Sequence, residues 1–138
     1  VKKMNGIKHI FFNRTRDLLL CVVLTFVSIS AIGQMETIVK GLEEGQAQAV
    51  SQYFSDEVWL CIIDFEDSVN SNEASSRLSQ FFNNYKVIEF NQLHNGGSSS
   101  HEHEVVIGKL KTNNGNFRVY IYLDGEKNKQ IDEFRIED

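Results

Sequence analysis

The sequence EVVIGKLKTNNGNFRVYIYLDG, residues 104–125, decides the fold because it holds two strands and the turn between them. Residues 116–125 alternate between apolar and polar side chains, which is typical of a strand with one buried face. The side chains predicted to face the core are those of Phe117, Val119, Ile121 and Leu123, and those predicted to face outward are those of Arg118, Tyr120 and Tyr122. Asn113, Asn114 and Gly115 predict a tight hairpin turn.

Further strands are predicted on both sides of this hairpin. One is KVIEFNQLH, residues 86–94, and another is KQIDEFRIED, residues 129–138. In the last strand Phe134 and Ile136 share a face, whereas Ile131 is out of phase with them. We therefore expect a bulge or a late strand start near Ile131.

A strand is also predicted at DEVWLCIIDF, residues 56–65, from its β-branched and aromatic residues. Both of its faces are apolar, with Val58, Leu60 and Ile62 on one and Trp59, Cys61 and Ile63 on the other. Such a strand is either covered on both sides or offers one side to a partner.

Helices are predicted at residues 35–45, 46–54 and 70–85, the first two joined at Gly45. The third has apolar residues at helical spacing, and Asn70 or Ser71 is expected to cap it. Helices on one face of an antiparallel sheet make an α+β domain.

The N-terminal residues 1–33 have the pattern of a secretory signal peptide. A basic start is followed by a run without charge from Leu18 to Met35, and small residues precede a cleavage site expected after Gly33. An uncleaved membrane anchor is the alternative, although it requires about 20 apolar residues. Cys21 lies in the middle of the apolar run, which argues against a lipoprotein. We expect residues 34–138 to form a single domain exported to the periplasm or cell envelope, without a stable membrane anchor after cleavage.

Removal of this leader would leave nine basic and eighteen acidic side chains, a formal net charge of −9. A surface this acidic repels nucleic acid and anionic lipid headgroups, so neither is an expected partner. Cys61 would be the only remaining cysteine and is interpreted as a buried hydrophobe. An interchain disulfide or a reactive thiol is the alternative.

Three stretches carry a resemblance to a known superfamily: IVKGLEEGQAQAVSQYF (38–54), VVIGKLKTNNGNFRVYIYL (105–123) and EFRIED (133–138). The sequence resembles the nuclear transport factor 2-like, or cystatin-like, superfamily. Within it, the sequence looks most like a family of small exported bacterial proteins classed as a domain of unknown function. The resemblance implies a cone-shaped, curved antiparallel sheet packed on helices around a conical cavity. Some members are isomerases or dehydratases, and others bind ligands or dimerise, so the fold alone does not fix the function.

Enzymes of that superfamily place an Asp, His or Tyr inside the cone, but no motif identifies such a residue in this chain. Asp64, Tyr85, Glu89 and His94 can reach a cavity mouth, depending on strand phase. Each is interpreted as a solvated or core-edge group, so no catalytic or cofactor-binding residue is assigned and no cofactor is expected. An Asp–His or Asp–Tyr pair inside an apolar cavity would instead indicate an enzyme.

The stretch HNGGSSSHEHE, residues 94–104, allows two interpretations. His94, His101 and His103 provide enough ligands for zinc or copper. The glycines and serines between them are typical of a flexible turn, which must be ordered before it binds a metal. We therefore predict a hairpin tip and assign no metal site.

The sequence favours an exported, non-enzymatic domain that binds a small ligand or an envelope protein. A small isomerase- or dehydratase-like enzyme and a structural subunit of an envelope complex are the alternatives. Trp59, Tyr120 and Tyr122 are expected on the outer sheet face, where they either pair across strands or form an interface. The resemblance implies that a homodimer would use this face.

Overall fold

The computed structural model describes residues 30–97, 103–126 and 129–138. The chain divides into two compact units, Val1–Met35 and Glu36–Asp138, and the second carries the fold. The predicted signal peptide lies almost wholly outside the described residues. Within the described ranges, no helix is long and apolar enough to cross a membrane.

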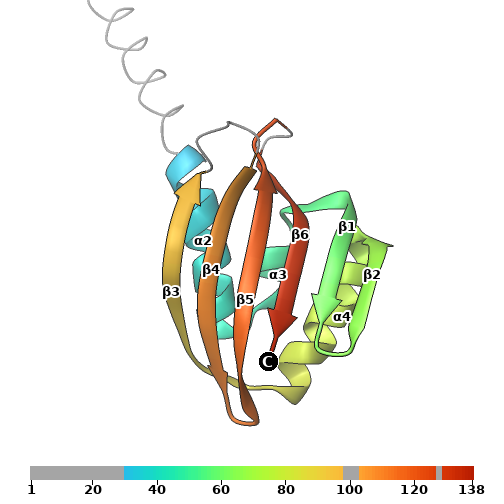
Figure 1. The fold of residues 1–138 in the computed structure, drawn as a ribbon, viewed down its shortest axis with the longest axis vertical. Coiled ribbons are helices and arrows are strands. Elements are labelled where there is room, and N and C mark those ends of the chain that lie inside the picture. The colour runs from blue at the N-terminus through green and yellow to red at the C-terminus, as the bar shows by residue number, and fades with distance from the viewer. Residues whose placement is uncertain (1–29, 98–102, 127–128) are drawn as a thin grey trace, which may run out of the picture. The chain divides into compact units, whose positions relative to one another are not determined.

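Six strands form one curved sheet in the order β2-β1-β6-β5-β4-β3 (Figure 1). Their bounds are β1 Phe54–Ile62, β2 Phe65–Asn70, β3 Val87–Gly97, β4 His103–Thr112, β5 Gly115–Asp124 and β6 Gln130–Glu137. The sheet is antiparallel as predicted except at one place, where β1 and β6 pair in parallel. Strands β3, β4, β5 and β6 are joined by three successive antiparallel pairings. Strand β6 then lies beside β1, and the two run in the same direction. The sheet is therefore mixed, and the α+β class is confirmed.

The helices lie together on one face of this sheet (Figure 1). They are α2 Ser30–Glu44, α3 Ala47–Ser51 and α4 Ser71–Asn84. Gly45, with a φ of 64°, separates α2 from α3 as predicted, because glycine adopts this left-handed conformation without steric cost. Helix α2 begins five residues before the predicted start, and α3 ends three residues before its predicted end.

Helix α4 is capped as the sequence predicts. The side-chain oxygen of Asn70 accepts a hydrogen bond from the Glu73 backbone N–H at 3.0 Å. Four side chains of α4 are buried, those of Ala74, Leu78, Phe81 and Phe82. The helix contacts both β1 and β2, so it holds that end of the sheet against the core.

The strand predicted at residues 56–65 is two strands. A turn at Ile63 and Asp64 ends β1 and sends the chain back as β2, which pairs with β1 antiparallel. Strand β2 was missed because the β-branched Ile63 precedes the single usual turn residue, Asp64, so the two-residue turn reads as a continuation of the strand. Ile63 nevertheless adopts a φ of 54°, which is rare for a β-branched residue.

The alternation predicted in β5 is confirmed, with Phe117, Val119, Ile121 and Leu123 all buried. The irregularity predicted near Ile131 is confirmed as well. Tyr122 pairs with Glu133, but Leu123 pairs with Ile131, so β6 has one extra residue between the two pairs. This bulge returns Ile131 to the core, where it is fully buried beside Phe134 and Ile136.

Candidate functional site

The four residues considered as candidates at a cavity mouth are not brought together. Asp64 is exposed in the β1–β2 turn, and Glu89 and His94 are exposed on the edge strand β3. Tyr85 is half-buried at the end of α4. No hydrogen bond joins any two of them, so among the described residues they do not form the acid–base pair that would indicate an enzyme.

Aromatic side chains pack against one another between the helices and the sheet. The Tyr85 ring stacks on Phe81, with ring centroids 4.7 Å apart and planes 17° apart. Phe117 packs edge-on against both rings, at 5.3 Å from Phe81 and 5.1 Å from Tyr85. On the other side of the core, Phe54 packs edge-on against Phe134 at 5.8 Å. These rings fill part of the space between the helices and the sheet, and a hollow of about 570 Å³ lies where α4 and the α2–α3 connection meet the start of β3.

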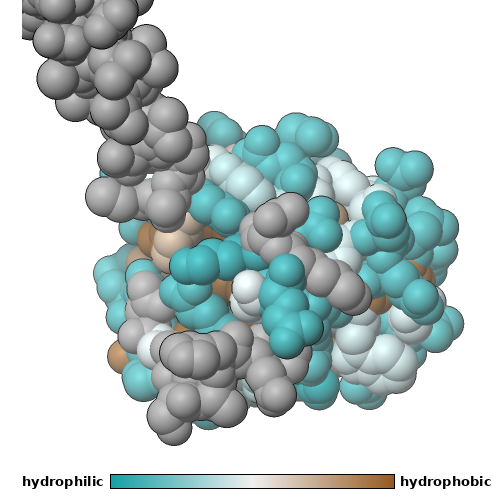
Figure 2. Space-filling view, turned by 90° about the horizontal axis from the view of Figure 1, so that it is seen from above, coloured by the Kyte–Doolittle hydropathy of each residue, from teal (hydrophilic) through white to brown (hydrophobic). Residues whose placement is uncertain are grey.

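Seen from the end at which β3 and β5 finish, the visible described surface is mainly hydrophilic (Figure 2). Hydrophobic residues show there only in small separate areas.

A hollow of about 200 Å³ lies where α4 meets the β1–β2 turn, and Tyr85, Ile63 and Arg77 line it. The Arg77 guanidinium lies 3.5 Å above the centre of the Phe65 ring and donates to Glu73 at 2.8 Å. Its charge is therefore already paired inside the protein. The volume is below the range of about 300–1,000 Å³ that small-molecule sites usually have.

The outer face of the sheet, which we define as the face opposite the helices, carries exposed aromatic side chains. Strand register places Trp59 beside Glu133, and Glu133 beside Tyr122. Tyr120 lies beside Arg135 in the next row. Trp59 is 42% exposed and the two tyrosines are half-buried. We call Trp59, Tyr120 and Tyr122 the outer aromatic band.

Arg135 organises the charges next to this band. Its guanidinium donates to Glu137 at 2.7 Å and to Glu133 at 3.1 Å, and it forms a longer ion pair with Glu66 at 3.7 Å. The hydrogen bonds that Arg135 donates to Glu137 and Glu133 raise its pKa. This cluster was not predicted from the sequence. Glu133, Arg135 and Glu137 are every second residue of their strand, so their side chains share one face.

Cys61 lies beside Arg135 and Glu66 in the strand register and is buried, as predicted. Burial raises the pKa of its thiol, and the positive charge of Arg135 opposes that shift. A thiol of this kind stays protonated at neutral pH and is a poor nucleophile. The alternative of a reactive thiol therefore finds no support in this environment.

The histidine stretch lies only partly within the described residues. Strands β3 and β4 pair antiparallel up to Gly97 and Glu104, so the stretch connects a hairpin. Residues 98–102 and the side chain of His103 are outside the described part. Within that part, no group of three or more His, Cys, Asp or Glu side chains is placed to hold a metal ion.

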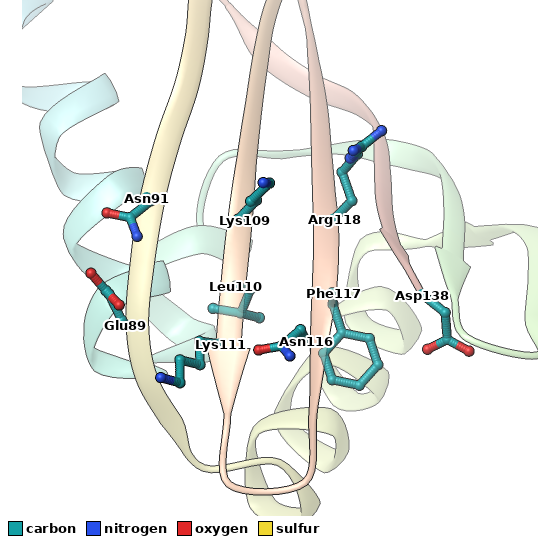
Figure 3. Close-up of a pocket in the computed structure, with 9 residues that line it drawn as sticks. All are labelled: Glu89, Asn91, Lys109, Leu110, Lys111, Asn116, Phe117, Arg118 and Asp138. Carbon is teal, nitrogen blue, oxygen red and sulfur yellow. The ribbon is translucent and has the colours of Figure 1, made fainter.

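The outer face also has a hollow of about 530 Å³ between β3, β4 and β5, next to the end of β6 (Figure 3). Its polar lining residues are Glu89, Asn91, Lys109, Lys111, Asn116, Arg118 and Asp138. Lys109 and Arg118 are directly opposite each other on β4 and β5. We call this site the basic hollow, after its three cations. The sequence analysis did not identify it, because the pairing of Lys109 with Arg118 depends on the hairpin register.

Comparisons with known proteins agree with the fold. A family model described as "Domain of unknown function (DUF4783)" matches residues 35–137. A crystal structure of a DUF4783 family protein from Bacteroides uniformis is 35% identical, with 75% of this chain and 94% of that chain covered and a TM-score of 0.68. One from Bacteroides ovatus is 33% identical, with 74% and 92% covered and the same TM-score. No match was found among curated proteins.

A more distant solved structure, an uncharacterised protein from Silicibacter pomeroyi with a cystatin-like fold, is similar in fold alone. It is 8% identical, with 75% of this chain and 72% of that chain covered and a TM-score of 0.56. The predicted likeness to the nuclear transport factor 2-like, cystatin-like fold is thereby confirmed.

Proposed function

Since the chain belongs to the DUF4783 family, whose function is unknown, we propose that it is an exported, non-enzymatic domain that binds a second copy of itself through the outer face of its sheet. The observation that carries this proposal is the contrast between the two faces of the sheet. On the inner face, stacked and edge-on aromatic rings occupy the core. On the outer face, the chain's one tryptophan is exposed beside two tyrosines.

The lack of a paired acid and base among the four candidates favours binding over catalysis. A superfamily enzyme needs an apolar cavity with paired titratable groups, whereas Phe81, Tyr85 and Phe117 pack ring against ring in the core. The four candidate acids and bases lie apart, three of them exposed to solvent. The outer aromatic band is the feature that fits a protein partner.

The composition of the band supports a protein partner. Trp, Tyr and Arg are enriched at interaction hot spots, and Trp59, Tyr122 and Arg135 lie on neighbouring strands here. A two-fold contact needs only one patch, because the same surface serves both copies. The dimerisation through the sheet that the superfamily resemblance implies makes a second copy the favoured occupant.

Sedimentation velocity of residues 34–138 over a range of concentrations tests the proposal. We expect a monomer–dimer equilibrium that is lost when Trp59 and Tyr122 are both replaced by alanine. Ile88→Ala is the matched control, because Ile88 is an exposed hydrophobic residue on the edge strand β3, away from the band. A monomer at every concentration, or equal weakening by Ile88→Ala, would contradict a dimer formed through the band.

Export is supported by the basic start and the long run without charge before residue 36. Fractionation of the native host, followed by mass spectrometry of the N-terminus, tests it. We expect protein in the envelope fraction that begins at Gln34. Recovery of the uncut chain from the cytoplasm would refute export without bearing on the dimer.

A further inference from the structure

We infer that the basic hollow binds a small molecule that carries an oxyanion, either a carboxylate or a phosphate, with hydroxyl groups next to it. This inference goes beyond the proposed dimer and does not rest on it. The basic hollow uses Lys109, Lys111 and Arg118, none of which belongs to the outer aromatic band.

The first argument is that none of these three cations forms a salt bridge within the described part of the chain, although Glu89 is opposite Lys111 in the strand register and Glu137 acts on Arg118 electrostatically. Elsewhere in the described chain Lys40, Arg77 and Arg135 each form a salt bridge. Among the described residues, no carboxylate forms a salt bridge with Lys109, Lys111 or Arg118, although the domain has twice as many acidic as basic side chains.

The carboxylate next to Arg118 forms its salt bridge with a different cation. It is the strand neighbour of Glu137 in the register, but the Glu137 carboxylate binds the Arg135 guanidinium at 2.6 Å instead. The hydrogen-bond partner of Arg118 is the hydroxyl of Tyr120, at a long 3.5 Å. The guanidinium therefore keeps most of its donors for a ligand.

The second argument is the direct opposition of Lys109 and Arg118. Like charges at opposed positions of an antiparallel pair repel each other and destabilise the sheet. An anion between the two side chains would turn this repulsion into two attractive, charge-assisted hydrogen bonds. Lys111, two residues along β4, is on the same face and adds a third cation.

The third argument concerns size and lining. The volume of about 530 Å³ is within the usual range for small-molecule sites, which is about 300–1,000 Å³. Asn91 and Asn116 line the hollow with amide groups, which can both donate to and accept from hydroxyl groups.

Acidic groups limit the length of the ligand. Glu89 lies on β3 at one side of the hollow, and Asp138 lies beyond β6 at the other (Figure 3). The two carboxylates would repel an extended polyanion that crosses the whole hollow. A compact anion seated near Lys109 and Arg118 avoids them, which is why we infer a small molecule rather than a nucleic acid or an acidic polysaccharide.

Nuclear magnetic resonance titration of residues 34–138 at constant ionic strength tests the inference. The family model matches residues 35–137, and about three quarters of this chain covers 92–94% of the crystallised Bacteroides relatives, so a domain of this size folds in those relatives. The probes are glucuronate for the carboxylate, glucose 6-phosphate for the phosphate, and glucose as the neutral control. We expect saturable shifts of the backbone amides of residues 109–118 with one or both anions and none with glucose, and the stronger anion identifies the group.

Charge removal provides the second measurement. Lys109→Gln combined with Arg118→Gln is expected to lower the affinity by about tenfold or more, since hydrogen bonds to charged groups are lost. Lys86→Gln is the matched control, because this cation is outside the hollow and donates to the Phe82 carbonyl. Lys111→Gln alone gives a milder test if the double variant does not fold. Absence of saturable binding by both anions, or equal affinity in the double variant and the wild type, would overturn the inference.

Discussion

The Phe90 ring lies directly over Gly108 on the neighbouring strand, so closely that a Cβ carbon at position 108 would be 2.2 Å from Phe90 Cζ. Phe90 is on the edge strand β3 and is buried, while Gly108 is in the middle of β4. A glycine covered by a neighbouring aromatic ring is a common device for holding a strand in a curved sheet. The contact therefore couples the curvature of the sheet to the packing of its edge.

Gly108→Ala is expected to destabilise the domain, because the Phe90 ring must leave its position to admit the new methyl group. Overpacking of this kind costs about 1–3 kcal/mol. Chemical denaturation measures the change, and Gly96→Ala is the control, since the nearest atoms there belong to the exposed and movable His94 side chain. Equal stability of the Gly108→Ala variant and the wild type would show that the contact is not tight.

Ile63→Asn is expected to stabilise the domain by about 1 kcal/mol, because a left-handed conformation is costly for a β-branched residue and easier for asparagine. Ile63 has a φ of 54° in the β1–β2 turn. Thermal unfolding measures the gain. Ile88→Asn, at an exposed β-branched residue without a positive φ, should give no gain. A loss of stability in the Ile63 variant would mean that its side-chain contacts outweigh the backbone strain.

Asn70→Ala is expected to lower the stability by about 1 kcal/mol, because it removes the N-cap of α4. The lost hydrogen bond is the one that Glu73 N–H donates to the Asn70 side chain. Denaturant unfolding measures the change. Asn72→Ala, an exposed change within the same first turn, should have a much smaller effect.

The stability of the wild type is expected to fall as the pH rises above about 8.5, the usual range of a thiol pKa. Burial raises the pKa of Cys61 in the folded state, so the folded state retains a proton that the unfolded state has lost. The stabilising contribution is full below the unfolded pKa and is lost as the pH rises through the folded one. Comparison of the wild type with Cys61→Ala isolates the contribution of this thiol to the pH dependence of stability. Parallel curves of stability against pH for the two proteins would disprove it.

The sequence predicted the parts of the fold that depend on local periodicity. The alternation in β5, the capping of α4 at Asn70 and the bulge before Phe134 all follow from side-chain spacing within a few residues. The order of helices and strands predicted the packing of the helices on one face of the sheet, and the resemblance to a known superfamily implied its curvature.

Features that depend on long-range pairing were missed. The parallel contact of β1 with β6 joins residues more than 70 positions apart, and no local pattern encodes its direction. Strand β2 was missed because Ile63 occupies a turn position at which glycine or asparagine is expected. The basic hollow was not predicted for a similar reason, since Lys109 and Arg118 become neighbours only through the register of the hairpin.

The fluorescence of Trp59 gives the most direct measurement of the central claim, because it is the chain's one tryptophan and lies in the outer aromatic band. If a second copy covers this face, the emission should shift to shorter wavelength and become less accessible to acrylamide as the protein concentration rises through the dimerisation range. Tyr122→Ala should move that transition to higher concentration. An emission spectrum and a quenching constant that stay the same from nanomolar to high micromolar protein would contradict the account.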